Sequence, residues 1–545
     1  MTTKSKMMIR PEVDRSDVQA IAWTAFGSLK GASYMLLRVI EPHAARQWLR
    51  GLAPASLHDL SVADVKKNVE GVKKNGGETY QIAFTAAGLL ALGIDETIVK
   101  RFSPEFVEGM ASNENRSRRL GDTGANAPRN WSWGIGDKEP HILLILLSSD
   151  AERLETFVAK MLGQAEASGL SKIDILPTSD MGDVEPFGFS DGISQPSFDW
   201  DNHRTPGTTA DRDYTNLLAL GELLLGYRNE YGLLTERPWL DGSEKNAGML
   251  PRASRPPDRR DLGLNGSYLV YRQLAQDVRG FWRWVAGEAA RVGVTMDELA
   301  ESMVGRRLGG EPLADLTLGR SIPGVEARNS NFNGFLYDTD PGGLSCPIGA
   351  HIRRANPRTG DAPGGRQGPL DNLLVMLGLT VRRARAATSS TLPWPRNTTV
   401  WPFLRSEDDA IASARFHRIL RRGREYGGQI DRNSALDPAT PDPQAGIHFL
   451  CLNANIARQF EFVQGAWIAS AKFAALNGEQ DPLLGNREPF PTAPIAKPQP
   501  TDGFSRPGAP PQCRHATGLP QFVNVRGGAY FFLPGLAALR WIASD

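Results

Sequence analysis

Three polar side chains stand far apart in this chain and have the types that a single reaction can use. Asp191 lies in the turn-rich loop FGFSDGISQP at 187–196, and His351 lies in the stretch CPIGAHIRRANPR at 346–358. Arg421 follows two apolar residues, where we expect a strand that runs into a turn. A neutral imidazole can bind a metal ion, and histidine is a common axial ligand of haem iron.

An aspartate and an arginine would complete the set of groups that cleaves hydrogen peroxide at such an iron. A base must move a proton from one peroxide oxygen to the leaving oxygen, and a fixed cation must stabilise the charge that develops there. The glycines that bracket Asp191 would let its loop approach a flat macrocycle closely. Taken singly, each residue has an ordinary explanation: turn aspartates often bond to their own backbone. On its neighbours alone, His351 fits a basic surface loop as well as a metal site.

The totals exclude several classes of function. The 545 residues include 62 basic and 61 acidic side chains, so we expect neither a nucleic-acid partner nor a membrane surface. Three cysteines cannot build a disulfide framework. The first residues show neither an apolar signal segment nor a twin arginine, so we expect a cytoplasmic protein. The longest aliphatic run, 142–147, is far too short to span a bilayer and predicts a buried strand.

Strands and helices interleave without a strict βαβ rhythm, which favours the α+β class. In the first 200 residues we expect strands at 33–40, 79–84 and 141–147, and helices at 43–52, 85–92, 104–110 and 150–162, with Thr85 and Asp150 as helix caps. Beyond residue 266 we expect strands at 267–273, 418–427, 446–452 and 523–532, and helices at 277–291, 296–304, 456–468 and 533–542. The order of elements therefore predicts two similar halves.

The expected boundaries follow from this order. Residues 1–200 form an N-terminal half that ends in the Asp191 loop, and residues 266–545 form a C-terminal half. Between them, the polar and Pro-, Gly- and Arg-rich stretch 201–265 predicts a long excursion on the surface. A second insertion is expected at about 359–412, where Gly and Pro gather at both ends.

Several stretches in order resemble the dye-decolorizing peroxidase family, particularly its larger members. The three stretches that carry the resemblance most strongly are GFSDGISQP, CPIGAHIRRANPR and RILRRGREYGG. Further stretches match in the same order, namely SYMLLRVIEPHAARQWLRGL, MVGRRLGGEPL, GIHFLCLNANIARQFEFVQ and VNVRGGAYFFLPGLAALRWI. The resemblance implies two ferredoxin-like α+β halves, with one haem b held mainly by the C-terminal half.

The resemblance also implies the roles of individual residues. His351 corresponds to the proximal haem ligand, Asp191 to the distal acid–base residue and Arg421 to the distal arginine. Arg421 is chosen over Arg422 because the family's arginine follows two apolar residues, here Ile419 and Leu420. Neighbours on a strand point in opposite directions, so Arg422 would face away from the site. Gly192 and Arg353 are further expected contacts of the cofactor. The implied activity is the reduction of hydrogen peroxide, through a ferryl intermediate, with dyes, phenols or other aromatic compounds as reductants.

Two matters stay open at the level of sequence. Many family members place a carboxylate behind the proximal histidine, where this chain aligns Asn455, and Glu461 is the alternative partner. The insertion at 359–412 could wall the access channel, form an interface or decorate the surface, and its Trp394 and Trp401 are possible electron carriers. The oligomeric state, monomer or dimer, is also open.

Two other classes of function compete with the peroxidase. A haem carrier or sensor would keep His351 but would need neither Asp191 nor Arg421. A carboxylate-based hydrolase is the third possibility, although the chain has neither a nucleophile elbow nor an H-E-x-x-H zinc motif. If Asp191 is the base, we expect an acidic optimum, since the ordinary pKa of aspartate is about 4.

Overall fold

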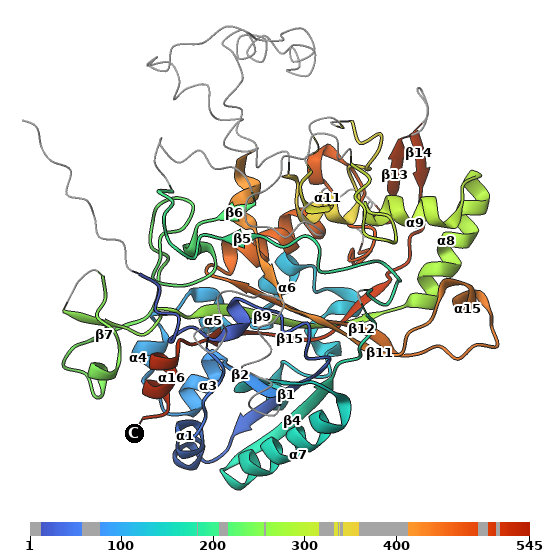
Figure 1. The fold of residues 1–545 in the computed structure, drawn as a ribbon. Coiled ribbons are helices and arrows are strands. Elements are labelled where there is room, and N and C mark those ends of the chain that lie inside the picture. Colours follow the sequence, from blue (N-terminus) through green and yellow to red (C-terminus); the bar gives the residue numbers. More distant parts are fainter. Residues whose placement is uncertain are drawn as a thin grey trace, which may run out of the picture.

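A single antiparallel sheet organises the protein (Figure 1), in the order β10-β12-β9-β15-β2-β3-β1-β4, with β11 also paired to β12. The computed structural model describes residues 12–56, 77–182, 184–206, 216–254, 258–314, 332–358 apart from 336, 338, 339 and 341, 412–488, 500–507 and 513–544. The insertion expected at 359–412, with its Trp394 and Trp401, lies almost wholly outside these residues.

The N-terminal half has the ferredoxin-like order of strands. Strands β1 (Gly31–Val39) and β2 (Glu78–Phe84) flank helix α1 (Pro42–Arg50), and β3 (Ile142–Ser148) and β4 (Leu170–Pro177) flank helix α7 (Ala151–Ala167). In the sheet these strands lie in the order β4-β1-β3-β2. Both predicted caps are present: the Thr85 side chain accepts from the Gly88 amide and the Asp150 side chain from the Arg153 amide.

The C-terminal half repeats the same order with later strands. Strand β9 (Ser267–Gln276) is followed by α8 (Val278–Val292) and α9 (Met296–Val304), and then by the short strands β10 (Leu420–Arg421) and β11 (Arg424–Gly427). Strands β12 (Ala445–Asn453) and β15 (Val523–Leu533) complete the order β15-β9-β12-β10/β11. The two halves join where Phe532 of β15 pairs with Phe84 of β2. The α+β fold with two ferredoxin-like halves is therefore confirmed.

The remaining elements are short. The helices are α3 (Ala86–Ala91), α4 (Glu96–Val99), α5 (Pro104–Glu108), α6 (Glu114–Leu120), α11 (His351–Ala355), α15 (Arg432–Leu436) and α16 (Leu536–Ile542). The strands are β5 (Ser197–Phe198), β6 (Leu217–Leu218), β7 (Trp239–Asp241), β8 (Arg259–Asp261), β13 (Phe504–Pro507) and β14 (Cys513–Ala516). The helix expected at 456–468 consists of two consecutive π-helical segments, η10 (Ala457–Glu461) and η11 (Val463–Ile468). Such wide helices are rare and are often found at functional sites.

Both faces of the sheet are buried, and β3 shows why its sequence is an unbroken aliphatic run. Ile142, Leu144 and Leu146 enter the core on one face, and the residues between them enter the core on the other. Helix α7 packs on the first face (Figure 1). A strand covered on both sides needs apolar residues at every position.

The stretch 201–265 differs from the surface excursion that we expected. Among its described residues, Leu218, Leu220, Leu223 and Leu224 are at most 1% exposed and pack in the core on the second face of the sheet. These side chains keep water away from that face of the sheet. Moving each of them from water into the core stabilises the fold by roughly 1.5–3 kcal/mol. Polar composition over the whole stretch concealed this apolar run. No helix among the described residues has the length and apolar character needed to cross a membrane.

Candidate active site

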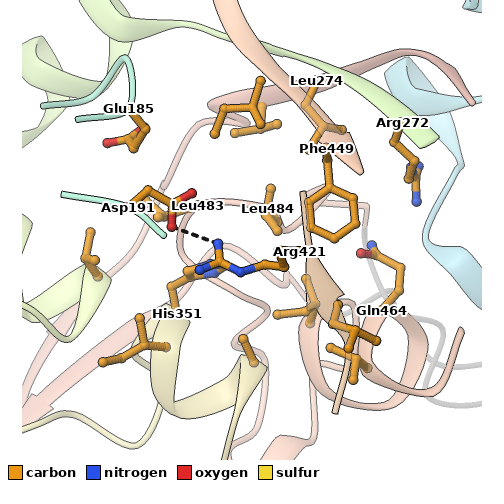
Figure 2. Close-up of a pocket in the computed structure, with 18 of the residues that line it drawn as sticks. Glu185, Asp191, Arg272, Leu274, His351, Arg421, Phe449, Gln464, Leu483 and Leu484 are labelled. Atoms are coloured by element: carbon orange, nitrogen blue, oxygen red, sulfur yellow. Dashed lines mark hydrogen bonds and ion pairs between the residues drawn. The ribbon is translucent and has the colours of Figure 1, made fainter. Parts of the chain in front are cut away.

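The three sequence-predicted residues line one cavity between the halves. Asp191 reaches it from the loop after β4, Arg421 from the edge strand β10, and His351 from the first turn of α11. Figure 2 shows His351 pointing from α11 toward the Asp191–Arg421 pair. Although 160 residues separate Asp191 from His351 in sequence, the fold brings them to the same space.

Asp191 and Arg421 form an ion pair. Arg421 Nη1 donates to Asp191 Oδ1 at 2.7 Å, and the side chains are 28% and 36% exposed because both face the cavity. Burial alone would raise the pKa of Asp191. Interactions that include those with the Arg421 guanidinium and the Gly192 amide lower it by more than burial raises it, so the net pKa lies below the ordinary value. Asp191 is therefore held as a carboxylate at acidic pH.

The neighbouring Arg422 points to the opposite side, as strand alternation predicts. Its Nε donates to the Ile21 carbonyl at 2.8 Å and its Nη2 to the Trp23 carbonyl at 3.0 Å. Gly192 has a φ of +78°, which favours glycine at this turn immediately after Asp191. This backbone conformation explains why residue 192 is a glycine.

His351 is oriented by an aspartate that the sequence did not single out. Its Nδ1 lies 3.0 Å from Asp481 Oδ2, and the Asp481 carboxylate is completely buried. The amides of Leu483 and Leu484 each donate to the other oxygen, Asp481 Oδ1, at 2.9 Å. Because Nδ1 is engaged with Asp481, Nε2 is the nitrogen that remains for a ligand in the cavity.

The charges of this pair reinforce one another. Burial by itself lowers the pKa of His351, but the Asp481 carboxylate raises it more, so the net shift is upward. For Asp481, burial raises the pKa, while His351 and Arg354 lower it to a value below the ordinary one. A buried carboxylate behind a histidine raises the basicity of that ligand.

Neither of the two partners considered from the sequence contacts His351. Asn455 Oδ1 accepts from the Arg458 amide at 2.8 Å. Glu461 is buried in another cluster, where its Oε2 accepts from Arg119 at 3.1 Å and its Oε1 from the Tyr530 hydroxyl at 2.9 Å. Neither candidate is therefore the partner of His351, and the question that the sequence left open is answered by Asp481. The DPLL turn at 481–484 was the available signal, because an aspartate followed by proline commonly binds nearby amides.

Arg353 does not line the cavity. Its Nη1 donates to the Cys346 carbonyl at 2.6 Å, and its Nη2 donates to the Asp340 carbonyl at 2.8 Å. Two positions along a helix correspond to a rotation of about 200°, so Arg353 and His351 point to opposite sides of α11. The expected contact of Arg353 with a cofactor is therefore not supported, and its contacts hold the loop before α11.

Two features lock α11 in place. The Arg354 guanidinium is completely buried and donates to the Trp467 carbonyl at 2.9 Å and the Ser470 carbonyl at 3.0 Å. On the other side, Gly305 ends α9 with a φ of +93°, and a Cβ there would lie 2.7 Å from Ile352 Cγ1. The close approach that glycine permits sets α11 against α9, so His351 has a fixed direction.

The cavity walls suit a large planar and mostly apolar ligand. The cavity encloses about 1860 Å³ of space without atoms, part of which is open to solvent. Part of its apolar lining comes from β9, β12, the π-helical segments and the loop after Asp481, namely Leu274, Ile447, Phe449, Phe460, Val463, Leu483 and Leu484. Figure 2 shows Phe449 and Leu484 among the side chains that line the cavity together with Asp191 and Arg421.

Polar groups of the lining form a second set. Glu185 accepts from the Phe187 and Phe189 amides at 3.0 and 3.1 Å, and burial raises its pKa to about 7. Burial also raises the pKa of Asp122, which pairs with Arg272, to about 6. Among the described residues, three lining oxygens are buried without a hydrogen-bond partner, namely Asp122 Oδ2, Gln276 Oε1 and Asn356 Oδ1. Buried polar atoms of this kind need an explanation, and a bound polar group would supply one.

The sequence of the chain is similar to sequences of known proteins over most of its length. Dye-decolorizing peroxidase msp1 of Mycetinis scorodonius is 27% identical over 481 residues, which cover 85% of this chain and 76% of the relative. The chain is a relative of the dye-decolorizing peroxidases. The multifunctional dye peroxidase DyP2 of an Amycolatopsis species is 26% identical over 515 residues, or 90% of this chain and 87% of that relative. No protein-family model matches the chain.

Solved structures of dye-decolorizing peroxidases share the fold over almost the whole chain. An ancestral D-type dye-decolorizing peroxidase superposes with a TM-score of 0.66 at 21% identity and covers 98% of this chain and all of the other. A DyP-type peroxidase of Anabaena superposes with a TM-score of 0.62 at 21% identity, covering 97% of this chain and 94% of that chain. At these identities the likeness concerns the fold.

Proposed function

We propose that this protein is a haem-dependent peroxidase that reduces hydrogen peroxide and oxidises dyes, phenols or other aromatic reductants. The relatives named above are dye-decolorizing peroxidases. The observation that carries the proposal is a single cavity in which an oriented histidine, His351, is combined with the ion pair of Asp191 and Arg421.

The residues of the cavity fit one haem b. His351 would bind the iron through Nε2, because Asp481 holds Nδ1. The apolar side chains of β9 and β12 would pack against the macrocycle, and the lining cations Arg306 and Arg418 suit its carboxylates. The three unpartnered lining oxygens are consistent with a polar ligand edge or bound water. Because most lining residues come from beyond residue 266, we assign haem binding mainly to the C-terminal half.

The bound haem would supply the redox-active iron at which the peroxide oxygen–oxygen bond is cleaved. Asp191 serves as the base that takes the proton from one peroxide oxygen and delivers it to the leaving oxygen. The Arg421 guanidinium stabilises the negative charge on that oxygen, and it also keeps Asp191 ionised at acidic pH. Asp481 makes His351 a more basic ligand and fixes the plane of its ring.

A haem carrier or sensor is the competing function. It would require His351 and the apolar walls, but it would give no role to the Asp191–Arg421 pair, which holds a carboxylate against burial. Taking two charges out of water costs free energy, and shifted pKa values gather at functional sites, so an ion pair at a cavity wall is more easily explained by chemistry than by stability.

The test is to load the purified protein with one equivalent of haem and to follow peroxide-dependent oxidation of a phenol and a dye. We expect a Soret band, turnover with peroxide and an acidic optimum. His351→Ala should lose the band or shift it strongly, whereas Arg353→Ala, a change on the other side of α11, should keep the spectrum of a histidine-bound haem. A haem-loaded protein that shows no turnover with peroxide would leave the carrier or sensor as the better account.

A further inference from the structure

The side chain of Gln195 contacts the backbone of Arg421 at two points. Its Oε1 accepts from the Arg421 amide at 3.0 Å, and its Nε2 donates to the Arg421 carbonyl at 3.3 Å. Gln195 lies four residues after Asp191 in the same loop. One carboxamide therefore links the loop that carries the aspartate to the strand that carries the arginine.

The position of Arg421 in the sheet explains why this link matters. Strand β10 has only two residues and lies at the edge of the sheet, where its one partner is β12. Arg421 pairs with Cys451 on that side. An edge strand leaves the backbone groups of its outer side without a strand partner, and a two-residue strand has little pairing to hold it. The Gln195 carboxamide takes the place of a further strand at this residue.

Gln195 is itself held from two other segments. Its carbonyl accepts from Asn216 Nδ2 at 2.5 Å and from Asn333 Nδ2 at 3.0 Å. Its amide donates to the Ile193 carbonyl at 3.0 Å. These bonds fix the backbone of Gln195. Its side chain can therefore hold the backbone of Arg421 in a fixed place.

We propose that Gln195 is a positioning residue that fixes Arg421 beside Asp191. The inference rests on the proposed function, in which that pair handles the peroxide protons and charge. The Gln195 side chain bonds to the backbone of Arg421, so it acts on the reaction through the placement of the guanidinium. Preorganised groups of this kind lose their effect when they are displaced by about 1 Å.

The charges around Asp191 determine what loss of this placement would do. Arg421 and His351 favour its carboxylate, while the carboxyl groups of Glu185 and Glu425 interact with it as like charges. Arg306 also interacts with Asp191 electrostatically. Arg421 contributes more to the lowering of the Asp191 pKa than His351 does. A displaced Arg421 would therefore raise the pKa of Asp191 and move the acid limb of the pH profile to higher pH.

The experiment measures amide hydrogen exchange and the pH profile in the haem-loaded protein. Exchange must be measured for each amide separately. The Arg421 amide donates to Gln195 Oε1, whereas the Arg422 amide donates to the Leu450 carbonyl inside the sheet at 2.7 Å. In Gln195→Ala we expect the Arg421 amide to exchange about 10-fold faster or more, and the Arg422 amide to stay protected. The acid limb of kcat/KM for peroxide should move to higher pH. Gln521→Ala, at a glutamine that bonds to the Val523 carbonyl, is the control.

Gln195→Glu provides a second variant of similar shape. It keeps an acceptor for the Arg421 amide but loses the donor to the Arg421 carbonyl, so its exchange rate should lie between those of the wild type and Gln195→Ala. Wild-type exchange at Arg421 and an unmoved acid limb in Gln195→Ala would overturn the proposal. Exchange needs no turnover, so a wild type without peroxide reactivity would refute the proposed function alone. A reactive wild type with unchanged exchange in the variants would refute only the role of Gln195.

Discussion

Asp191 Oδ1 and Arg421 Nη1 lie 2.7 Å apart although 230 residues separate them, and their contact joins a loop of one ferredoxin-like half to an edge strand of the other. In the proposed function, the pair combines a base with the cation that keeps it ionised. Each residue is thus exposed to the cavity while its charge is balanced. This relationship would make the proposed peroxide reaction sensitive to pH in a way that can be measured.

Replacing Arg421 by Gln should move the acid limb of peroxide reactivity to higher pH. The pKa of Asp191 lies below its ordinary value in the folded protein, and Arg421 is the largest single cause of the lowering. With the cation gone, Asp191 takes up a proton at higher pH and the fraction of active carboxylate falls on the acidic side. At its optimum, kcat/KM should also fall by roughly 10²–10³-fold, the usual cost of losing one charge-stabilising donor.

Arg422→Gln is the matched control for that experiment, since its guanidinium binds the Ile21 and Trp23 carbonyls on the other face of the strand. It removes the same charge one residue away. We expect a less stable protein with an acid limb at the wild-type position. Equal displacement of the limb in both variants would show that net charge, and not the ion pair, sets the pKa of Asp191.

Asp481→Asn should raise the reduction potential of the bound iron. An anionic partner makes His351 a stronger donor and stabilises the ferric state, and a neutral amide does so less. If the outer partner is worth roughly 10–100-fold, the shift is roughly 60–120 mV for one electron. Spectroelectrochemistry measures it. Asn455→Ala is the control, since Asn455 bonds to the Arg458 amide, and a shift of the same size there would argue against the role of Asp481.

Protonation of a buried histidine should weaken the fold in acid. His448 Nε2 donates to the Pro177 carbonyl at 3.1 Å, so in the neutral ring Nδ1 accepts from the Tyr271 hydroxyl at 2.9 Å. Burial lowers its pKa from 6.5 to about 4. The unfolded chain therefore binds the proton more readily than the folded protein between these values, and stability falls as the pH drops from 6.5 toward 4.

For His448 the expected loss between pH 7 and pH 5 is about 2 kcal/mol of the free energy of unfolding. Urea unfolding at the two pH values measures it in the wild type and in His448→Gln. The variant loses packing against Tyr34 and Tyr271, so it should be weaker at both pH values, but its pH-dependent loss should be smaller. An identical pH dependence in both proteins would mean that other groups dominate the acid unfolding.

Much of the architecture could be predicted from local patterns. Residues 142–147 of strand β3 form an unbroken aliphatic run, and the Thr85 and Asp150 caps follow directly from residue type and position. The direction of Arg421 against Arg422 follows from the period of a strand. These features depend on neighbours in the sequence, which is why the sequence suffices for them.

Features that depend on distant contacts were beyond such patterns. Asp481 reaches His351 from 130 residues away, and only the fold brings them together. The leucine-rich segment at 217–225 is a partial exception, because its apolar character was visible but was averaged into a polar stretch. The link between Gln195 and Arg421 has no local signal, since it uses the outer edge of a strand whose partner order is a property of the whole sheet.

The most direct test of the account mixes the haem-loaded protein with one equivalent of hydrogen peroxide and follows the visible spectrum by stopped flow. At mildly acidic pH we expect the position and intensity of the wild-type Soret band to change after mixing with peroxide. Asp191→Asn, with the same resting spectrum, should react roughly 10²–10⁴-fold more slowly because it lacks the base. A wild type whose spectrum does not respond, or an Asp191→Asn variant that reacts at the wild-type rate, would contradict the account.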